Sequence, residues 1–227
     1  TSSFTQAVQY LDRALVLLGR TQLSDDEKQQ SRADILRSLG ETLQYTGDYD
    51  DGIMNLEEAR NLYDAMNQPE NLAHTLVLLA DIEWRKGAYG EAIEYAEQGL
   101  EIFRNFDNQV GVGLALNRLG MVYTEQGDYT KASPYFEDSL NISRESGDLS
   151  MSANALNNLG LVAIYANGDH QTARELIEQS LEISRKTGER RKVAAGLLNL
   201  GSIAGGQKDF AKAKEYLLET LQTCRAI

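Results

Sequence analysis

One short turn motif returns along these 227 residues at a nearly constant spacing. The motif is Gly-Asp-Tyr or a close variant, and its copies begin at Gly47, Gly87, Gly127, Gly168 and Lys208. The four intervals between copies are 40, 40, 41 and 40 residues. Because self-similarity at a fixed period is the signature of repeat architectures, the chain is predicted to stack one structural unit along its length.

Both flanks of the turn repeat as well. Upstream lies a Leu-x-x-Leu-Gly pattern that ends at Gly40, Ala80, Gly120, Gly160 and Gly201. Downstream, a small residue lies five positions after the start of the turn, and later copies add a Leu-x-Ile pair. Apolar residues at i, i+3, i+4 and i+7 on both sides predict two amphipathic helices per unit. The recurring Gly and Ala would let these two helices approach closely.

Each unit is therefore predicted to contain a helix A, a tight turn, a helix B and a short loop. The turn glycine supplies a positive φ, and the Asp after it can cap helix B. The units close at Asn67, Asp107, Gly147 or Gly188, residue types that tolerate the left-handed conformation at a helix end. One extra residue near Asn167 is expected to lengthen the turn of the fourth unit.

The spacing predicts one array over residues 1–227. Its five helix pairs are expected at 24–67, 68–107, 108–147, 148–188 and 189–227, after an orphan helix B at 1–19. This gives about eleven helices. Terminal repeats usually present a polar outer face, which neither end of this sequence shows. We therefore expect a segment of a longer array, with self-association through its uncapped ends.

With these motifs in place, the chain resembles the tetratricopeptide repeat (TPR) family over nearly its whole length. The third unit carries the family's positions as Leu119, Gly120, Tyr123, Gly127, Tyr129, Ala132 and Phe136. The resemblance implies an all-α fold, a right-handed α-α superhelix. The unit is longer than the common one of about 34 residues. It is similar to the long-helix subclass of kinesin light chains, spindle-orienting adaptors, bacterial peptide-sensing regulators and the sensor arms of STAND-type ATPases.

The charge balance narrows the class of partner. Lys and Arg total 22 and Asp and Glu total 34, which gives a net charge of −12. Nucleic-acid phosphates are bound mainly by Lys and Arg, so direct nucleic-acid binding is not expected. The acidic surface favours basic or neutral partners. No apolar run approaches the roughly 20 residues that a membrane-spanning helix needs, so no membrane partner is predicted.

The cysteine and histidine content indicates neither a disulfide nor catalysis. Cys224 is the only cysteine, which suits the reducing cytoplasm, and its place on an apolar helix face predicts burial. His74 and His170 lie far apart in the array, and His170 takes the Tyr position of a turn. Neither has the partners of a zinc site or a catalytic triad, and no phosphate-binding glycine loop is present. We expect no enzyme activity, cofactor or metal.

The resemblance implies that the A helices line a concave binding face. In the family, the Asn just before the helix-A Leu-Gly pair commonly holds an extended peptide; Asn158 and Asn199 match that position, whereas Arg118 does not. Side-chain amides both donate and accept hydrogen bonds. The candidate groove residues are Ser38, Glu41, Tyr45, His74, Leu78, Asp81, Trp84, Arg85, Asn117, Arg118, Met121, Asn154, Asn157, Asn158, Leu161, Tyr165 and Asn199.

The sequence thus predicts a non-catalytic scaffold that binds a protein or peptide along the concave face. The alternative is the sensor arm of a larger signalling ATPase or transcription regulator, packed on its own effector domain. A purely structural spacer is the third interpretation.

Overall fold

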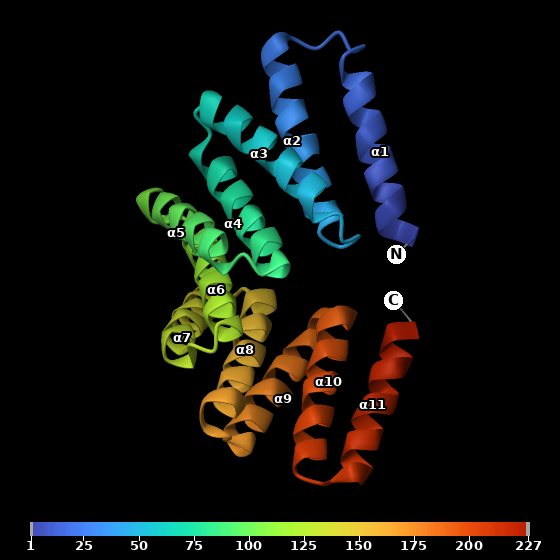
Figure 1. Ribbon diagram of the computed structural model, residues 1–227, viewed down its shortest axis with the longest axis vertical. Helices are drawn as coiled ribbons and strands as arrows, with labels where there is room; N and C mark the ends of the chain where they lie inside the picture. Colours follow the sequence, from blue (N-terminus) through green and yellow to red (C-terminus); the bar gives the residue numbers. More distant parts are fainter. Residues whose placement is uncertain (1, 226–227) are drawn as a thin grey trace. The chain divides into compact units, whose positions relative to one another are not determined.

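The computed structural model describes residues 2–225, and this part of the chain is helical without a strand. The helices are α1 (Ser2–Leu18), α2 (Asp25–Leu43), α3 (Tyr49–Ala65), α4 (Pro69–Lys86), α5 (Tyr89–Asn105), α6 (Gln109–Glu125), α7 (Tyr129–Ser146), α8 (Leu149–Asn167), α9 (His170–Thr187), α10 (Arg190–Gly206) and α11 (Phe210–Arg225). Figure 1 shows short connections joining successive helices. The predicted all-α repeat fold is confirmed, with eleven helices in the described range.

Two compact units make up the chain, Thr1–Gly111 and Val112–Ile227. The first holds α1 to α5, and the second holds most of α6 together with α7 to α11. In the first unit, α2 pairs with α3 and α4 with α5; in the second, α8 pairs with α9 and α10 with α11. Almost all packing is therefore between neighbours in sequence, as in other repeat proteins.

The turns have the backbone conformation that the motif predicts. The first residue of the turn has a positive φ in each copy, for example 89° at Gly47 and 75° at Gly127. In the degraded fifth copy Lys208 takes the same conformation, with φ of 64°. Asn67 and Asp107, with φ of 54° and 51°, end two of the B helices in the same way. The predicted positive φ of the turn glycine is thus confirmed.

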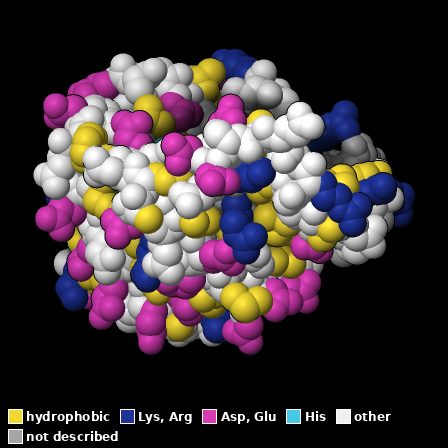
Figure 2. Space-filling view, turned by 90° about the horizontal axis from the view of Figure 1, so that it is seen from above, with side chains coloured by type: hydrophobic (Ala, Val, Ile, Leu, Met, Phe, Trp, Pro, Cys, Tyr) yellow, Lys and Arg dark blue, Asp and Glu magenta, His cyan; other side chains and the backbone are white. Residues whose placement is uncertain are grey.

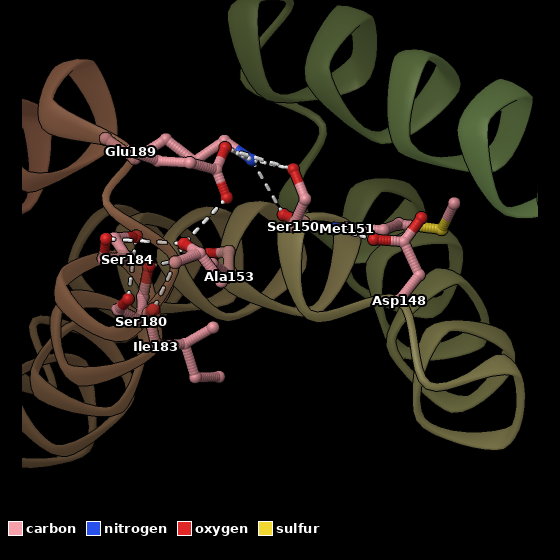
Figure 3. Close-up of polar contacts among 10 residues, drawn as sticks. Asp148, Ser150, Met151, Ala153, Ser180, Ile183, Ser184 and Glu189 are labelled. Carbon is pink, nitrogen blue, oxygen red and sulfur yellow. Dashed lines mark hydrogen bonds and ion pairs between the residues drawn. The ribbon is translucent and has the colours of Figure 1, made fainter.

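Acidic and hydroxyl side chains cap several helices. The carboxylates of Asp128 and Asp169 accept hydrogen bonds from backbone N–H groups three residues later, at 3.2 and 3.0 Å. Asp148 caps α8 in the same manner, which Figure 3 shows. Ser24 and Glu27 form a reciprocal capping box at the start of α2. Asp48 is an exception, because its carboxylate accepts instead from the hydroxyl of Thr46 at 2.7 Å.

Two expectations about single residues were wrong. The extra residue near Asn167 does not lengthen a turn; it extends the last turn of α8, which runs to Asn167 before Gly168 takes a positive φ. Cys224 is exposed rather than buried. It lies on α11, and among the described residues α10 is the one helix that packs against α11.

The crossing of helix A over helix B depends on the glycine of the Leu-Gly pair. A Cβ atom on Gly120 would lie 2.6 Å from the ring of Phe136 on α7. A Cβ on Gly160 would lie 2.6 Å from Ile177 on α9. Phe136 and Ile177 are 1% and 0% exposed, so neither side chain has room to move away. The large helix-B side chain fills the space that the missing Cβ leaves.

The second helix pair has a buried crossing at the same position, made by different residues. Its helix A carries Ala80 in place of glycine, and sixteen positions later its helix B carries Ala96 in place of a large side chain. Gly120 and Phe136 have the same separation. Ala80 and Ala96 are 1% and 0% exposed. A larger residue on helix A therefore occurs together with a smaller one on helix B, which keeps the combined volume of the crossing within bounds.

A double-mutant cycle tests this coupling. Gly120→Ala should lower the free energy of unfolding by about 1–2 kcal/mol, because overpacking exceeds the gain in helix propensity. Phe136→Ala should cost about 3–5 kcal/mol through the cavity it leaves. The double variant, which recreates the Ala80 and Ala96 pair, should lose less than the sum by at least about 1 kcal/mol. Urea unfolding followed by circular dichroism measures all three.

The matched control is Gly205→Ala on α10, where a Cβ would meet nothing within 4 Å. It should be neutral or stabilising by up to about 1 kcal/mol. Strictly additive losses in the Gly120 and Phe136 cycle would contradict the proposed coupling.

The cap at Asp169 should make stability depend on pH. Hydrogen bonds from the hydroxyl and the backbone N–H of Thr172 hold the pKa of Asp169 below its usual value. A carboxyl with a lowered folded-state pKa stabilises the fold above its unfolded pKa, and this contribution disappears as pH falls through the folded pKa. Asp169→Ala should therefore lower the thermal midpoint at neutral pH, and the difference from wild type should shrink in acid.

Asp169→Asn serves as the control, because Asn caps about as well as Asp but does not titrate. Thermal melts of the three proteins across the acidic range compare them. A difference between wild type and Asp169→Ala that stays constant into strong acid would contradict the assigned role of the carboxylate.

Candidate functional site

The second unit contains a pocket of about 260 Å³ on the side formed by its A helices. Its walls come from α6, α8 and α10, and one residue is contributed by α9. The lining residues are Asn117, Arg118, Met121, Ala153, Asn154, Asn157, Asn158, Ser180, Lys192 and Ala195. Four of the ten carry a side-chain amide and none carries a carboxylate, which sets this pocket apart in a strongly acidic protein.

Asparagine pairs connect the successive A helices. The Nδ2 of Asn158 on α8 donates to the Oδ1 of Asn117 on α6 at 3.2 Å. The Nδ2 of Asn199 on α10 donates to the Oδ1 of Asn157 on α8 at 2.9 Å. In each pair the donor directly precedes a Leu-Gly pair, and the acceptor lies two residues before the leucine of the preceding helix A. The asparagines thus fix the helices to one another as well as lining the pocket.

Asn117 keeps one polar group without a protein partner. Its side chain is 95% buried, since only 5% of its surface is exposed. The Oδ1 accepts from Asn158, but the Nδ2 has no hydrogen-bond partner in the described part of the chain. An unpaired buried donor costs roughly 1–3 kcal/mol. A donor kept in this state at a pocket wall is suited to a hydrogen-bond acceptor on a ligand.

Ser180 fixes the base of the pocket. This side chain is 4% exposed, and its hydroxyl donates to the backbone oxygen of Ala153 at 2.6 Å. Figure 3 shows the two residues meeting between α8 and α9. The bond uses the hydroxyl hydrogen, so Ser180 has no donor left for a ligand.

The positive charges at the pocket are already engaged. The Nζ of Lys192 lies 2.6 Å from the Oε2 of Glu189 and donates to the backbone oxygen of Ser150 at 2.9 Å. Figure 3 shows Ser150 and Glu189 facing each other across the ends of α8 and α10. Burial raises the pKa of Glu189, but hydrogen bonds from Lys192 and Thr187 outweigh it and lower that pKa overall. Arg118 contacts the Sδ of Met121 at 3.2 Å and takes part in a further interaction.

Six of the predicted groove residues therefore meet at one pocket. They are Asn117, Arg118, Met121, Asn154, Asn157 and Asn158. Asn199 does not line it but pairs with Asn157 behind it. Leu161 is half-buried, and Tyr165 is 58% exposed and stacks on Tyr129 with 5.9 Å between ring centroids.

Ala153, Ser180, Lys192 and Ala195 also line the pocket but were not among the predicted residues. Lys192 and Ala195 precede Asn199 by seven and four positions, so both lie on the same face of α10 as that predicted groove residue. Ser180 lies on a helix B, outside the A helices on which the groove residues were predicted.

The predicted residues of the first unit form no comparable pocket. Ser38 donates its hydroxyl to the backbone oxygen of Asp34 at 2.9 Å, and Glu41 is exposed. The ring of His74 packs edge-on against Phe103, with centroids 4.8 Å apart. Burial, followed by the charge of Arg37, lowers the pKa of His74, which favours the neutral imidazole.

The remaining predicted residues of this unit pack on one another. Leu78 contacts the apolar cluster around Leu56 and Leu79, and Asp81 is 3% exposed. The guanidinium of Arg85 lies 5.2 Å from the ring centroid of Trp84 and 5.9 Å from that of Tyr45. Tyr45 also stacks on Phe4, at 4.9 Å between centroids. These contacts engage the aromatic rings, while the indole N–H of Trp84 is buried and has no hydrogen-bond partner among the described residues.

A second cavity lies in the first unit, between α3, α4 and α5. It measures about 470 Å³ and is lined by Arg60, Asn61, Asp64, Leu72, Leu76, Gln98, Glu101, Ile102 and Asn105. None of these side chains has a buried polar atom without a partner. Over residues 2–225, no three His, Cys, Asp or Glu side chains are placed to hold a metal ion. In the same range no helix is long and apolar enough to cross a membrane.

Comparison with known proteins identifies the family of this repeat. A family model described as tetratricopeptide repeat matches residues 31–105, 111–166 and 151–226. No curated protein sequence matches the chain significantly.

Three solved structures illustrate how far the fold is shared. BtubC (BKLC) from P. vanneervenii is 20% identical with a TM-score of 0.75, over 100% of this chain and 92% of that one. The Rap conjugation gene regulator of plasmid pLS20, in complex with the Phr* peptide, is 15% identical with a TM-score of 0.81, over 96% and 58%. A STAND protein with a tetratricopeptide repeat sensor from Pyrococcus horikoshii is 18% identical with a TM-score of 0.71, over 95% and 33%. At these identities the likeness concerns the fold, and together with the matched family model it shows that the chain belongs to the tetratricopeptide repeat family.

Proposed function

We propose that this chain is a non-catalytic module that binds a peptide, or an extended segment of a protein, along the A-helix face of α6, α8 and α10. The observation that carries the proposal is the amide-lined pocket, with the unpartnered Nδ2 of Asn117 at its wall. A peptide backbone offers donors and acceptors in alternation, and side-chain amides can pair with both. The exposed amide of Asn154 extends this capacity to the rim of the pocket.

Fold likeness supports the same proposal. The Rap regulator with which the chain shares its fold holds a Phr* peptide. A stack of helix pairs presents an extended surface, and peptide binding is a common use of such surfaces. For this chain the chemistry of the peptide is inferred from the pocket.

The surface charge favours peptides with neutral or basic residues outside the pocket. Figure 2 shows acidic side chains spread over the visible face among uncharged and hydrophobic ones. With a net charge of −12, an acidic peptide would meet long-range repulsion, whereas a basic one would associate faster at low salt. A single cysteine suits a module that acts in the reducing cytoplasm.

A second candidate function is the sensor arm of a larger signalling protein. It is favoured by the apolar side chains of α11, where Leu217 and Leu221 are 44% and 56% exposed. The residues at the same repeat positions on α9, Ile177 and Leu181, are 0% and 5% exposed. The uncovered face of α11 is therefore suited to packing against another domain or a second copy, and the fold likeness to the sensor of a STAND protein agrees with it.

Selection from a phage-displayed random peptide library tests the leading proposal. The wild-type chain should enrich a common peptide motif, and Ala195→Trp should abolish the enrichment because an indole would fill the pocket. Ala211→Trp is the matched control, since Ala211 is also an exposed helical alanine but lies on α11, outside the pocket lining. Affinities of the enriched peptides, measured by isothermal titration calorimetry, should fall about tenfold or more in Ala195→Trp, which corresponds to about 1.4 kcal/mol.

If the wild-type chain enriches no motif, the peptide-binding proposal is wrong. If Ala211→Trp weakens binding and Ala195→Trp does not, binding takes place on α11, and the sensor-arm candidate is favoured instead.

A further inference from the structure

We propose that the pocket of α6, α8 and α10 receives a primary carboxamide, the side chain of an asparagine or glutamine in the bound peptide, in preference to a carboxylate. The inference deepens the proposed function and rests on it. It concerns one ligand group at one pair of side chains, Asn117 and Asn158.

The first requirement on the ligand is a hydrogen-bond acceptor. The Nδ2 of Asn117 is buried at the pocket wall and has no partner among the described residues. It cannot turn to a protein acceptor without giving up the bond that its own Oδ1 receives from Asn158. A carbonyl oxygen on the ligand satisfies this donor. A hydrocarbon group would leave it unpaired in a dry site, which is unfavourable.

The second requirement is a hydrogen-bond donor. Asn158 donates its Nδ2 to Asn117, and this bond leaves its Oδ1 able to accept. Asn158 is half-buried and lines the pocket. The bonded pair therefore presents an N–H from Asn117 and a carbonyl oxygen from Asn158. A primary carboxamide carries both complementary groups. A carboxylate has acceptors only, so one of its oxygens would oppose the Oδ1 of Asn158.

A peptide backbone and a carboxamide side chain meet these two requirements in different ways. In a trans peptide unit the N–H and the C=O point in opposite directions. One peptide unit can therefore satisfy Asn117 or Asn158, whereas a residue of an extended chain, whose own N–H and C=O point to the same side, can satisfy both only if the backbone itself enters the pocket. A primary carboxamide has an N–H on the same side as its oxygen, and it can reach both members of one hydrogen-bonded pair.

The charges at the pocket agree with a neutral group. Lys192 is held by Glu189 at 2.6 Å and by the backbone oxygen of Ser150, and Arg118 has interactions of its own. An incoming carboxylate would have to compete with Glu189 for Lys192. A neutral carboxamide makes no such demand and leaves the Lys192 and Glu189 pair intact.

Synthetic peptide pools that differ in one group test the inference. Each pool has a fixed central residue, Gln in one, Glu in the second and Leu in the third, and random flanks without Asn, Gln, Asp or Glu. The amino terminus carries a fluorescent label. The carboxyl terminus is an N-methylamide, because a simple amide cap would itself be a primary carboxamide. Fluorescence anisotropy at moderate and at high salt should show the Gln pool binding about tenfold more tightly than the Glu pool.

Variants of the protein connect the preference to the two asparagines. Asn117→Leu removes the donor and should bring the Gln and Glu pools to equal affinity. Asn158→Leu removes the opposing oxygen and should do the same, which provides a second variant if the first folds poorly. Asn199→Leu is the matched control, because it breaks an asparagine pair of the same kind without altering a lining residue. Its preference for the Gln pool should remain, and circular dichroism checks that each variant is folded.

Four outcomes decide between the proposals. A preference for Gln that both pocket variants lose and Asn199→Leu keeps supports the inference. Equal affinity of the wild-type chain for the Gln and Glu pools, or tighter binding of Glu at high salt, overturns the inference while peptide binding stands. A Gln preference that survives in both folded pocket variants also overturns it. If none of the three pools binds the wild-type chain, the proposed function fails together with the inference.

Discussion

The close crossing of helix A over helix B is the packing constraint on which the repeat depends. The absence of a Cβ at Gly120 and Gly160 lets Phe136 and Ile177 fill the crossing completely. The second pair keeps a buried crossing with Ala80 and Ala96, so a Cβ on helix A occurs there together with a small side chain on helix B. In the last pair the crossing is looser, since a Cβ on Gly201 would lie 3.5 Å from Leu217, and there the helix-B side chain is 44% exposed.

This crossing also determines what the A-helix face of the second unit can present. Each helix pair of the second unit has a similar crossing. The residues just before the Leu-Gly pair therefore lie at one level on α6, α8 and α10. At that level asparagines are close enough to bond to one another, as Asn158 does to Asn117 and Asn199 does to Asn157. The bonds use some of the amide groups to hold the helices and leave others facing the pocket. The structural and the proposed binding role of these asparagines therefore belong to the same geometry.

The period and the turn chemistry were sufficient to predict the fold, because each helix packs mainly on its neighbours in sequence and the motif marks every turn. The site was predictable only in part. The predicted groove residues included Asn117 and Asn158, but the sequence did not show that one bonds to the other, because that depends on the distance between helices. His74 and Trp84 were also predicted as groove residues, whereas in the structure His74 packs against Phe103 and Trp84 against Arg85. Burial of Cys224 was wrong because a helix pattern does not report whether another element covers it.

We propose that a ligand enters the second unit at the buried amide of Asn117. Side-chain amide resonances in a nuclear magnetic resonance titration test it most directly, because each NH₂ group reports its own hydrogen bonding. On addition of an enriched peptide, the NH₂ signals of Asn117 should shift, and their exchange with water should slow as the free donor gains an acceptor. The signals of Asn61 and Asn105, which line the cavity of the first unit, should stay unchanged. Saturable binding that leaves the Asn117 signals in place would contradict the account.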